Sequence, residues 1–292
     1  MKILVSISII CSLCCFMSIS AQESLKKFKT RIVGFDVSPN RKYISQVSWE
    51  KPVGIRNELI DATGLVTMID SSDIMQDPSM MSVCFLSDNK LLYGKGASSI
   101  YMYDPSEKLS IKMVELEGVD MIHKLRYDPA RHLLFVNINS YKRNKREVIV
   151  LDSNNNWQVK HRFSLPVDRN VLSMSVLPQG ELIYTTLETK EGSRKVKAFI
   201  WNKESEPRDI TDSVREVVPP FISIEAVSES NTLYVSTQNG IYKVNEKMDQ
   251  SEKILDYPDD NYAQFICVDQ SGTVLYYKLI NNYMLQTLLL NQ

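Results

Sequence analysis

Acidic side chains recur along the sequence in short polar segments that separate apolar ones. Together with one histidine they form a candidate ligand-binding set: Asp73, Asp77, Asp120, His123, Asp168, Asp212, Asp259 and Asp260. Carboxylates that converge in space can hold Ca²⁺ or Mg²⁺, which take several oxygen ligands, or engage a cationic peptide. A pair of them can also act as general acid and base. Solvation alone also produces charged loops, and loops that bind nothing are the more common explanation of such a pattern.

Other motifs for catalysis are absent from the sequence. No G-x-S-x-G, H-E-x-x-H, Walker loop, EF-hand loop or C-x-x-C occurs. The three histidines, His123, His132 and His161, show no metal-ligand spacing. We therefore assign no catalytic residue and expect no cofactor, with Ca²⁺ or Mg²⁺ at the acidic set as the alternative.

Basic side chains gather in a second class of loops. The segment 139–147, NSYKRNKRE, carries four cations around Asn144. It can grip an anionic glycan or phosphate, or form a solvated hairpin tip. Over the whole chain the charges nearly cancel, with a formal net charge of −1. This near-neutral charge gives no indication of nucleic-acid binding.

A repeated unit must position both classes of loop. Its six copies each read as apolar strand, polar turn, apolar strand: GFDVSPNRKYIS at 34, CFLSDNKLLYG at 84, LRYDPARHLLFV at 125, MSVLPQGELIYT at 174, EAVSESNTLYVS at 225 and CVDQSGTVLYYK at 267. The equivalent turn positions are Ser38, Ser87, Asp128, Leu177, Ser228 and Asp269, at spacings of 49, 41, 49, 51 and 41 residues. A period of ~40–50 residues built from short strands is typical of propeller blades.

Two further strands complete each unit. A third strand ends at Asp61, Asp104, Asp152, Asn202, Asn245 and Asn291, and an outer strand follows near 65, 110, 157, 208 and 252. The sixth unit has no outer strand after it, and the segment 25–33, LKKFKTRIV, can supply one. The sequence therefore predicts an all-β, six-bladed β-propeller whose last blade is closed by the N-terminal strand. A two-sheet sandwich and a seven-bladed ring are the alternatives.

Propeller geometry places the acidic set. Loops that link an outer strand to the next inner strand surround the mouth of the central channel, and the acidic residues lie in these loops. His123 enters the third inner strand, where it can face the channel with Asp120.

The first 21 residues are typical of a cleaved signal peptide. Lys2 precedes an apolar run from Ile3 to Met17, and Ile19-Ser20-Ala21 forms a small-residue cleavage site. A membrane anchor and a lipoprotein are the alternatives. Cleavage leaves one domain, residues 22–292, without a transmembrane segment. Two cysteines remain, Cys84 and Cys267, at matching positions of non-adjacent repeats, where distance would keep them as free thiols.

Some of these motifs resemble known families. SPNRKYIS at 38–45 looks like the blade motif of TolB-like six-bladed propellers, and the whole chain is similar to the exported TolB-like propellers of Bacteroidetes. TLYVSTQNGIYKVN at 232–245 is similar to the repeat of two-component-regulator propellers, over one blade. The resemblance covers roughly residues 25–292 and implies a periplasmic or surface-associated scaffold. The resemblance assigns no catalytic residues to this chain, because a shared fold does not determine function.

Three functions follow from these observations. The first is an exported, non-catalytic binding module for a protein, peptide or glycan, periplasmic or extracellular and monomeric. The second is a metal-dependent propeller enzyme of lyase, lactonase or glycosidase type that uses the acidic channel mouth. The third is a sensory or assembly partner of a membrane complex. The sequence favours the first.

Overall fold

The computed structural model describes most of the chain after residue 30. The described residues are 31–50, 54–72, 79, 82–140, 144–165, 169–190, 193–203, 205–227, 230, 232–245, 247–258, 261–280 and 285–290. The predicted signal peptide, 1–21, lies outside them and stays a prediction. No helix in this described part is long and apolar enough to cross a membrane.

Six antiparallel sheets make up the fold, in chain order. The first sheet contains β1 (Arg31–Val37), β2 (Tyr43–Glu50), β3 (Gly54–Asp61) and β4 (Val66–Ser72). The second contains β5 (Val83–Ser87), β6 (Lys90–Lys95), β7 (Ser99–Asp104) and β8 (Leu109–Glu115). The third contains β9 (Met121–Asp128), β10 (Leu133–Ser140), β11 (Lys145–Asp152) and β12 (Gln158–Leu165), with a short 3-10 turn, η2 (Ser153–Asn155), before β12.

The other three sheets repeat the pattern. The fourth contains β13 (Arg169–Val176), β14 (Leu182–Lys190), β15 (Ser193–Trp201) and β16 (Arg208–Asp209), followed by the helix α2 (Thr211–Val217). The fifth contains β17 (Phe221–Ala226), β18 (Leu233–Thr237), β19 (Gly240–Val244) and β20 (Ser251–Asp256). The sixth contains, among the described residues, β21 (Ala263–Val268), β22 (Val274–Leu279) and β23 (Leu285–Leu289).

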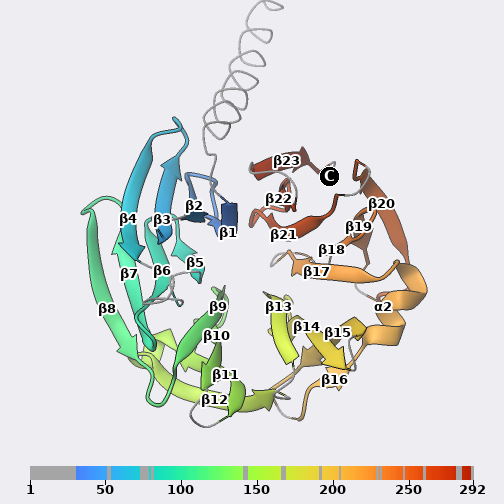
Figure 1. Cartoon of the computed structure of the whole chain (residues 1–292), viewed down its shortest axis with the longest axis horizontal. Helices are drawn as coiled ribbons and strands as arrows, with labels where there is room; N and C mark the ends of the chain where they lie inside the picture. The colour runs from blue at the N-terminus through green and yellow to red at the C-terminus, as the bar shows by residue number, and fades with distance from the viewer. Residues whose placement is uncertain are drawn as a thin grey trace, which may run out of the picture.

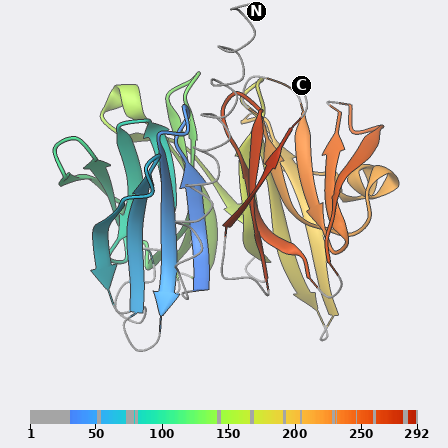
Figure 2. The ribbon, with the colours of Figure 1, turned by 90° about the horizontal axis from the view of Figure 1, so that it is seen from above.

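The sheets stand around a central axis as the blades of a propeller (Figure 1). The first strand of each sheet is innermost, and consecutive first strands contact one another around the ring, with β21 returning to β1. The strands run along the axis of this ring in the side view (Figure 2). The predicted six-bladed β-propeller is confirmed.

Apolar side chains between neighbouring blades hold the ring together. One cluster lies between the second and third sheets and includes Cys84, Ile122 and Leu134. Another lies between the third and fourth sheets and includes Phe135 and Tyr184. Both faces of the second strands, such as β10 and β22, are therefore buried, which explains the near-continuous apolar runs of the repeat. Each fully buried Leu or Phe side chain contributes about 1.5–3 kcal/mol.

The predicted outer strand at 208–214 is mostly a helix. Only Arg208 and Asp209 pair as β16, and α2 begins at Thr211. The Asp209 side chain accepts a hydrogen bond from the Thr211 N–H at 2.9 Å, which turns the chain out of the sheet. Thr211 and Val214, one helical turn apart, are buried, so the helix packs an apolar stripe where the pattern predicts a strand.

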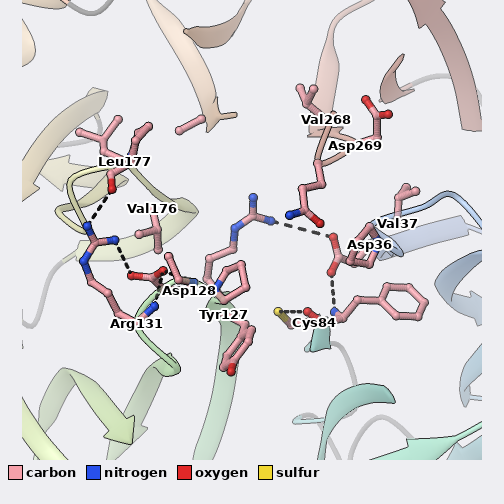
Figure 3. A pocket seen from close by; sticks show the side chains of 18 residues that line it. Asp36, Val37, Cys84, Tyr127, Asp128, Arg131, Val176, Leu177, Val268 and Asp269 are labelled. Carbon is pink, nitrogen blue, oxygen red and sulfur yellow. Dashed lines mark hydrogen bonds and ion pairs between the residues drawn. The ribbon is translucent and has the colours of Figure 1, made fainter. Parts of the chain in front are cut away.

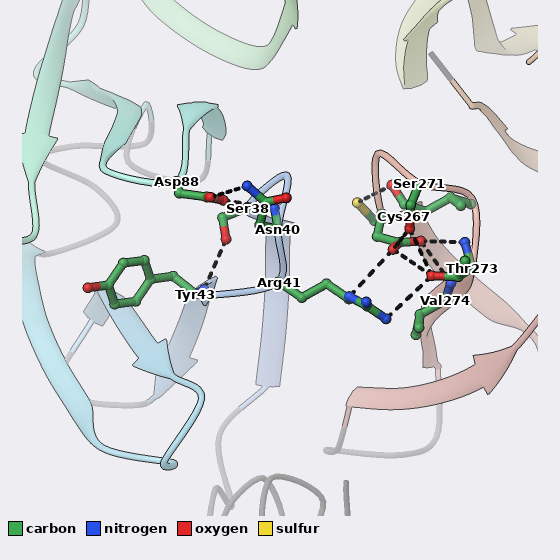
Figure 4. A network of polar contacts seen from close by, with 11 residues as sticks. Ser38, Asn40, Arg41, Tyr43, Asp88, Cys267, Ser271, Thr273 and Val274 are labelled. Carbon is green, nitrogen blue, oxygen red and sulfur yellow. Dashed lines mark hydrogen bonds and ion pairs between the residues drawn. The ribbon is translucent and has the colours of Figure 1, made fainter. Parts of the chain in front are cut away.

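The joint between the first and last blades is closed partly by turns. Arg41, in the turn after β1, reaches the turn after β21, where its Nε lies 3.6 Å from Asp269 and its Nη1 lies 3.3 Å from the Thr273 hydroxyl (Figure 4). Residues 25–30 of the predicted closing strand lie outside the described residues, and residues 31–33 belong to β1. Closure of the last blade by 25–30 stays a prediction.

Candidate binding channel

Two cavities occupy the central channel, one at each end. We call the end where each inner strand turns into the second strand the turn face, and the opposite end, where each inner strand begins, the loop face. The turn-face cavity has a volume of about 390 Å³ and the loop-face cavity about 270 Å³. Both are lined by Asp36 and Arg126, which therefore lie between them.

The turn-face cavity is lined by side chains that bond to one another. Arg131 donates through Nη1 to the Asp128 carboxylate at 3.3 Å and through Nη2 to the Pro178 carbonyl at 2.8 Å (Figure 3). Asp128 also accepts from the Ala130 N–H at 3.1 Å. Arg131 and Asp128 are therefore already bonded within the turns. We interpret this cavity as a consequence of turn packing and not as a ligand site.

An ion cluster crosses the channel between the two cavities. Arg126, from β9, donates through Nη2 to Glu225 of β17, and its Nη1 lies 3.9 Å from the Asp36 carboxylate of β1. Asp36 accepts from the Phe85 N–H of the next blade at 2.7 Å and from the Cys267 thiol at 3.3 Å. One arginine therefore links three blades at the centre of the ring.

Burial governs the pKa values in this cluster. Two carboxylates share one guanidinium, and desolvation outweighs its attraction, which raises the pKa of Asp36 and raises that of Glu225 to about 7. Burial opposes the charge of Arg126, but the two carboxylates overcome it and raise the pKa of Arg126. Burial also raises the pKa of the Cys84 and Cys267 thiols, both of which are free. These thiols are therefore protonated and unreactive.

Basic side chains line the loop-face cavity, together with serine hydroxyls. Lys124 and His123 come from β9, Ser82 from the segment before β5, and Ser223 and Glu225 from β17. The Lys124 Nζ lies 5.4 Å from the centre of the Phe265 ring, a cation–π contact. Burial lowers the pKa of Lys124 to about 8 against the attraction of Glu225.

His123 is neutral and lacks a partner within the described part of the chain. Its Nε2 is buried and makes no hydrogen bond there. Burial, with the positive charges of Lys124 and Arg146, lowers the pKa of His123 to about 4. The imidazole therefore faces the cavity as an uncharged group that can donate or accept one hydrogen bond.

The predicted site residues are only partly placed. Those that lie outside the described residues are Asp73, Asp77, Asp168, Asp259 and Asp260. His123 lines the loop-face cavity, whereas Asp120, half-buried just before β9, does not belong to the lining. Asp212 is exposed on α2, which packs on β15, a third strand. Among the described residues no group of three or more His, Cys, Asp or Glu side chains is placed to hold a metal ion.

Sequence reasoning missed the ion cluster and Lys124. Asp36 and Arg126 each lie two residues before the turn positions Ser38 and Asp128. Glu225 matches them once Val227, whose N–H bonds to the Thr232 carbonyl as that of Ser38 bonds to the Tyr43 carbonyl, replaces Ser228 as the turn position of its repeat. Charged residues at one position of an otherwise apolar strand are a detectable signal, because they must be paired when buried. A search for opposite charges at matching repeat positions would have found the cluster.

Comparison with known proteins supports the fold alone. No protein-family model matches the sequence, and no curated protein matches it. Among solved structures, U3-55K has a TM-score of 0.53 at 12% identity, over 87% of this chain and 89% of that one. A chain of the mitotic checkpoint complex has a TM-score of 0.56 at 12% identity, over 89% and 87%. A chain of Kuenenia stuttgartiensis hydrazine synthase has a TM-score of 0.56 at 10% identity, over 90% and 97%.

Sequence identities of 12% and 10% indicate a shared fold and do not indicate a shared activity. The protein is a six-bladed β-propeller.

Proposed function

We propose that the protein is an exported, non-catalytic β-propeller that binds a protein, peptide or glycan at the loop face. The observation that carries this proposal is the contrast inside the channel: the loop-face cavity presents Lys124 and His123 without hydrogen-bonding partners among the described residues, while the turn-face cavity presents Arg131 already bonded. Polar groups that the fold leaves unsatisfied in a concave site are typical of ligand pockets.

Two further observations support the proposal. The Arg126 cluster lies across the channel, so a ligand that enters at the loop face meets a floor of fixed charge. The signal-like segment 1–21 supports export, and the resemblance to exported TolB-like propellers supports a role as a scaffold in the periplasm or outside the cell.

A steric block tests the binding face without knowledge of the ligand. Asn144→Cys, in the loop-face turn between β10 and β11, and Asn89→Cys, in the turn-face turn between β5 and β6, are both exposed and can be coupled to a polyethylene glycol maleimide. Cys84 and Cys267 are buried and would not react in the folded protein.

Binding is measured on glycan and peptide arrays with the mature domain, 22–292. Coupling at position 144 should abolish binding that coupling at position 89 leaves intact. Equal binding after both couplings, or no ligand on either array, would overturn the proposal.

Export is tested by expression of the full chain in a Gram-negative host. The expected result is a periplasmic or secreted protein whose mass corresponds to an N-terminus at Gln22. Retention of the full-length chain in the cytoplasm would contradict export.

For the metal-dependent alternative, thermal melting with EDTA and then Ca²⁺ is informative, because a ligand of the folded state raises stability. A Ca²⁺-dependent rise that Asp120→Asn removes would favour that alternative.

A further inference from the structure

Lys124 is a half-buried cation without a dedicated anion among the described residues. It makes no hydrogen bond or ion pair with the described residues, and its Nζ faces the loop-face cavity beside the Phe265 ring. Glu225 attracts it at longer range but is bonded to Arg126. Taking an ammonium group out of water is costly unless it is paired, so an anion bound in the cavity beside Lys124 would be favoured.

A second cationic side chain near Lys124 also has a nitrogen without a partner among the described residues. On the third blade, Lys124 pairs with Asn137 and Arg146 pairs with Asn139. Asn137 and Asn139 lie two residues apart on β10, so Lys124 and Arg146 project from the same face of the sheet. Arg146 Nη1 is buried without a partner in the described part of the chain.

Hydrogen-bonding groups lie beside these cations. The ring of His123 lines the cavity, but its Nε2 is closed to solvent, so Nδ1 is the ring nitrogen that a ligand can reach. Ser223 lines the same cavity with a hydroxyl that bonds to none of the described residues. In contrast, Ser82 already donates to the Ile122 carbonyl at 3.1 Å. Lys124, His123 and Ser223 are therefore the groups that a ligand can satisfy.

We propose that the loop-face cavity binds a carboxylate of a small ligand, with Lys124 as its ion partner and His123 and Ser223 as its hydrogen-bonding partners. The inference rests on the proposed function and names the chemistry that the loop face recognises. Charge balance favours a monoanion, because Arg126 is already paired with Glu225 and Asp36, and Lys124 is the cation without an ion pair among the described residues that line the cavity. A phosphate dianion would leave an excess buried charge.

The volume limits the size of the ligand. The cavity, about 270 Å³, is smaller than the ~300–1,000 Å³ of sites for drug-sized ligands. It suits a single sugar acid or a single acidic amino-acid residue. Both present the same carboxylate, and both would extend the rest of a glycan or peptide toward the loop-face mouth.

Calorimetric titration of the mature domain tests the proposal with paired probes. Galacturonate is compared with galactose, and the α-amide of N-acetylglutamate with the α-amide of N-acetylglutamine, so that each pair differs in one carboxylate. The wild type should bind at least one acid at least tenfold more tightly than its neutral counterpart. Which pair shows the difference identifies a sugar or an amino-acid source.

Two variants distinguish binding at Lys124 from a general effect of the protein's charge. Lys124→Met keeps the length of the side chain and should weaken acid binding at least tenfold, whereas Lys112→Met, on the exposed outer strand β8, should leave it unchanged. Binding to the wild type should also fall about tenfold between pH 7 and pH 9, as Lys124, with a pKa of about 8, loses its proton. Glu225, Arg126, Asp36 and His123 line the same cavity, and of these Glu225, with a pKa of about 7, reinforces the fall as it ionises.

Equal binding of acids and neutral counterparts, or acid binding that survives Lys124→Met, would overturn the inference. If neither acid binds while the glycol block at position 144 still abolishes another ligand, the carboxylate site fails and the proposed function stands. If that block has no effect either, both fail.

Discussion

The two ends of the central channel are built from the same repeated strands, yet their polar side chains have different partners. At the turn face, Asp269 accepts from the Thr273 and Val274 N–H groups at 2.8 and 2.7 Å, and Asn40 bonds to Asp88 of the next blade through its N–H at 2.8 Å. At the loop face, Lys124 and His123 face a cavity without such bonds among the described residues. The turn face holds the ring together, and the loop face retains unsatisfied groups for a ligand.

Arg126, between the two ends, gives the largest expected effect. Arg126→Met leaves Glu225 and Asp36 buried without their cation, which should lower the free energy of unfolding by about 3–5 kcal/mol. Urea unfolding at pH 7 measures the loss. Adding Glu225→Leu should recover part of it, because an apolar pair tolerates burial. A double variant as unstable as the single one would contradict the central role of this pair.

Asp269→Ala tests the turn face. It leaves the buried N–H of Val274 and the half-buried N–H of Thr273 without their acceptor and should cost about 2–3 kcal/mol. Asp104→Ala, at an exposed turn where the carboxylate accepts from the Ser106 N–H at 2.8 Å, is the matched control and should cost clearly less, because water can replace the lost acceptor. Equal losses in denaturant unfolding would mean that burial of the turn adds nothing.

Gly180→Ala disturbs the turn face more gently. Gly180 has a φ of +84°, and an added Cβ would lie 2.3 Å from Arg131 Nε, so that the arginine must move from the Pro178 carbonyl. We expect a loss of about 1–2 kcal/mol. Gly96→Ala, at a φ of +64° with open space around it, measures the backbone strain alone. A loss no greater than that of the control would show that Arg131 is not held.

Lys124→Met should have the smallest effect on stability, with the opposite sign. Because the pKa of Lys124 is about 8 when folded and ~10.4 when unfolded, the unfolded chain binds more protons between these values. Stability therefore rises with pH across that range. Lys124→Met should remove the rise and stabilise the protein at pH 7 by about 1 kcal/mol or less. Destabilisation at pH 7, measured by urea unfolding, would show that the ammonium has a structural partner.

Much of the fold could be predicted from the sequence because the same repeat occurs six times. Turn residues such as Asp128 and Asp269 recur at a blade-length period, and an error in one copy is corrected by the others. The segment after Asp209 has no such correction. Its helix depends on one local hydrogen bond and on the burial of Val214 against the neighbouring strand.

The candidate site was less predictable, because it depends on which blades face each other across the channel. Arg126 and Glu225 are 99 residues apart, and their contact skips the blade between them. His123 could be placed from its position at the start of an inner strand. Lys124 could not, since a lysine in the same strand is equally compatible with an exposed edge until the partner blades are known.

The two free cysteines have a use that follows from their position. Cys84 and Cys267 lie in the inner strands of the second and sixth blades, on either side of the first. Burial keeps both thiols protonated, so a thiol reagent can modify them only when a blade separates from its neighbour. The native chain therefore carries its own pair of probes: the modification rate of Cys267 would report opening between the sixth and first blades, and that of Cys84 opening between the second and third.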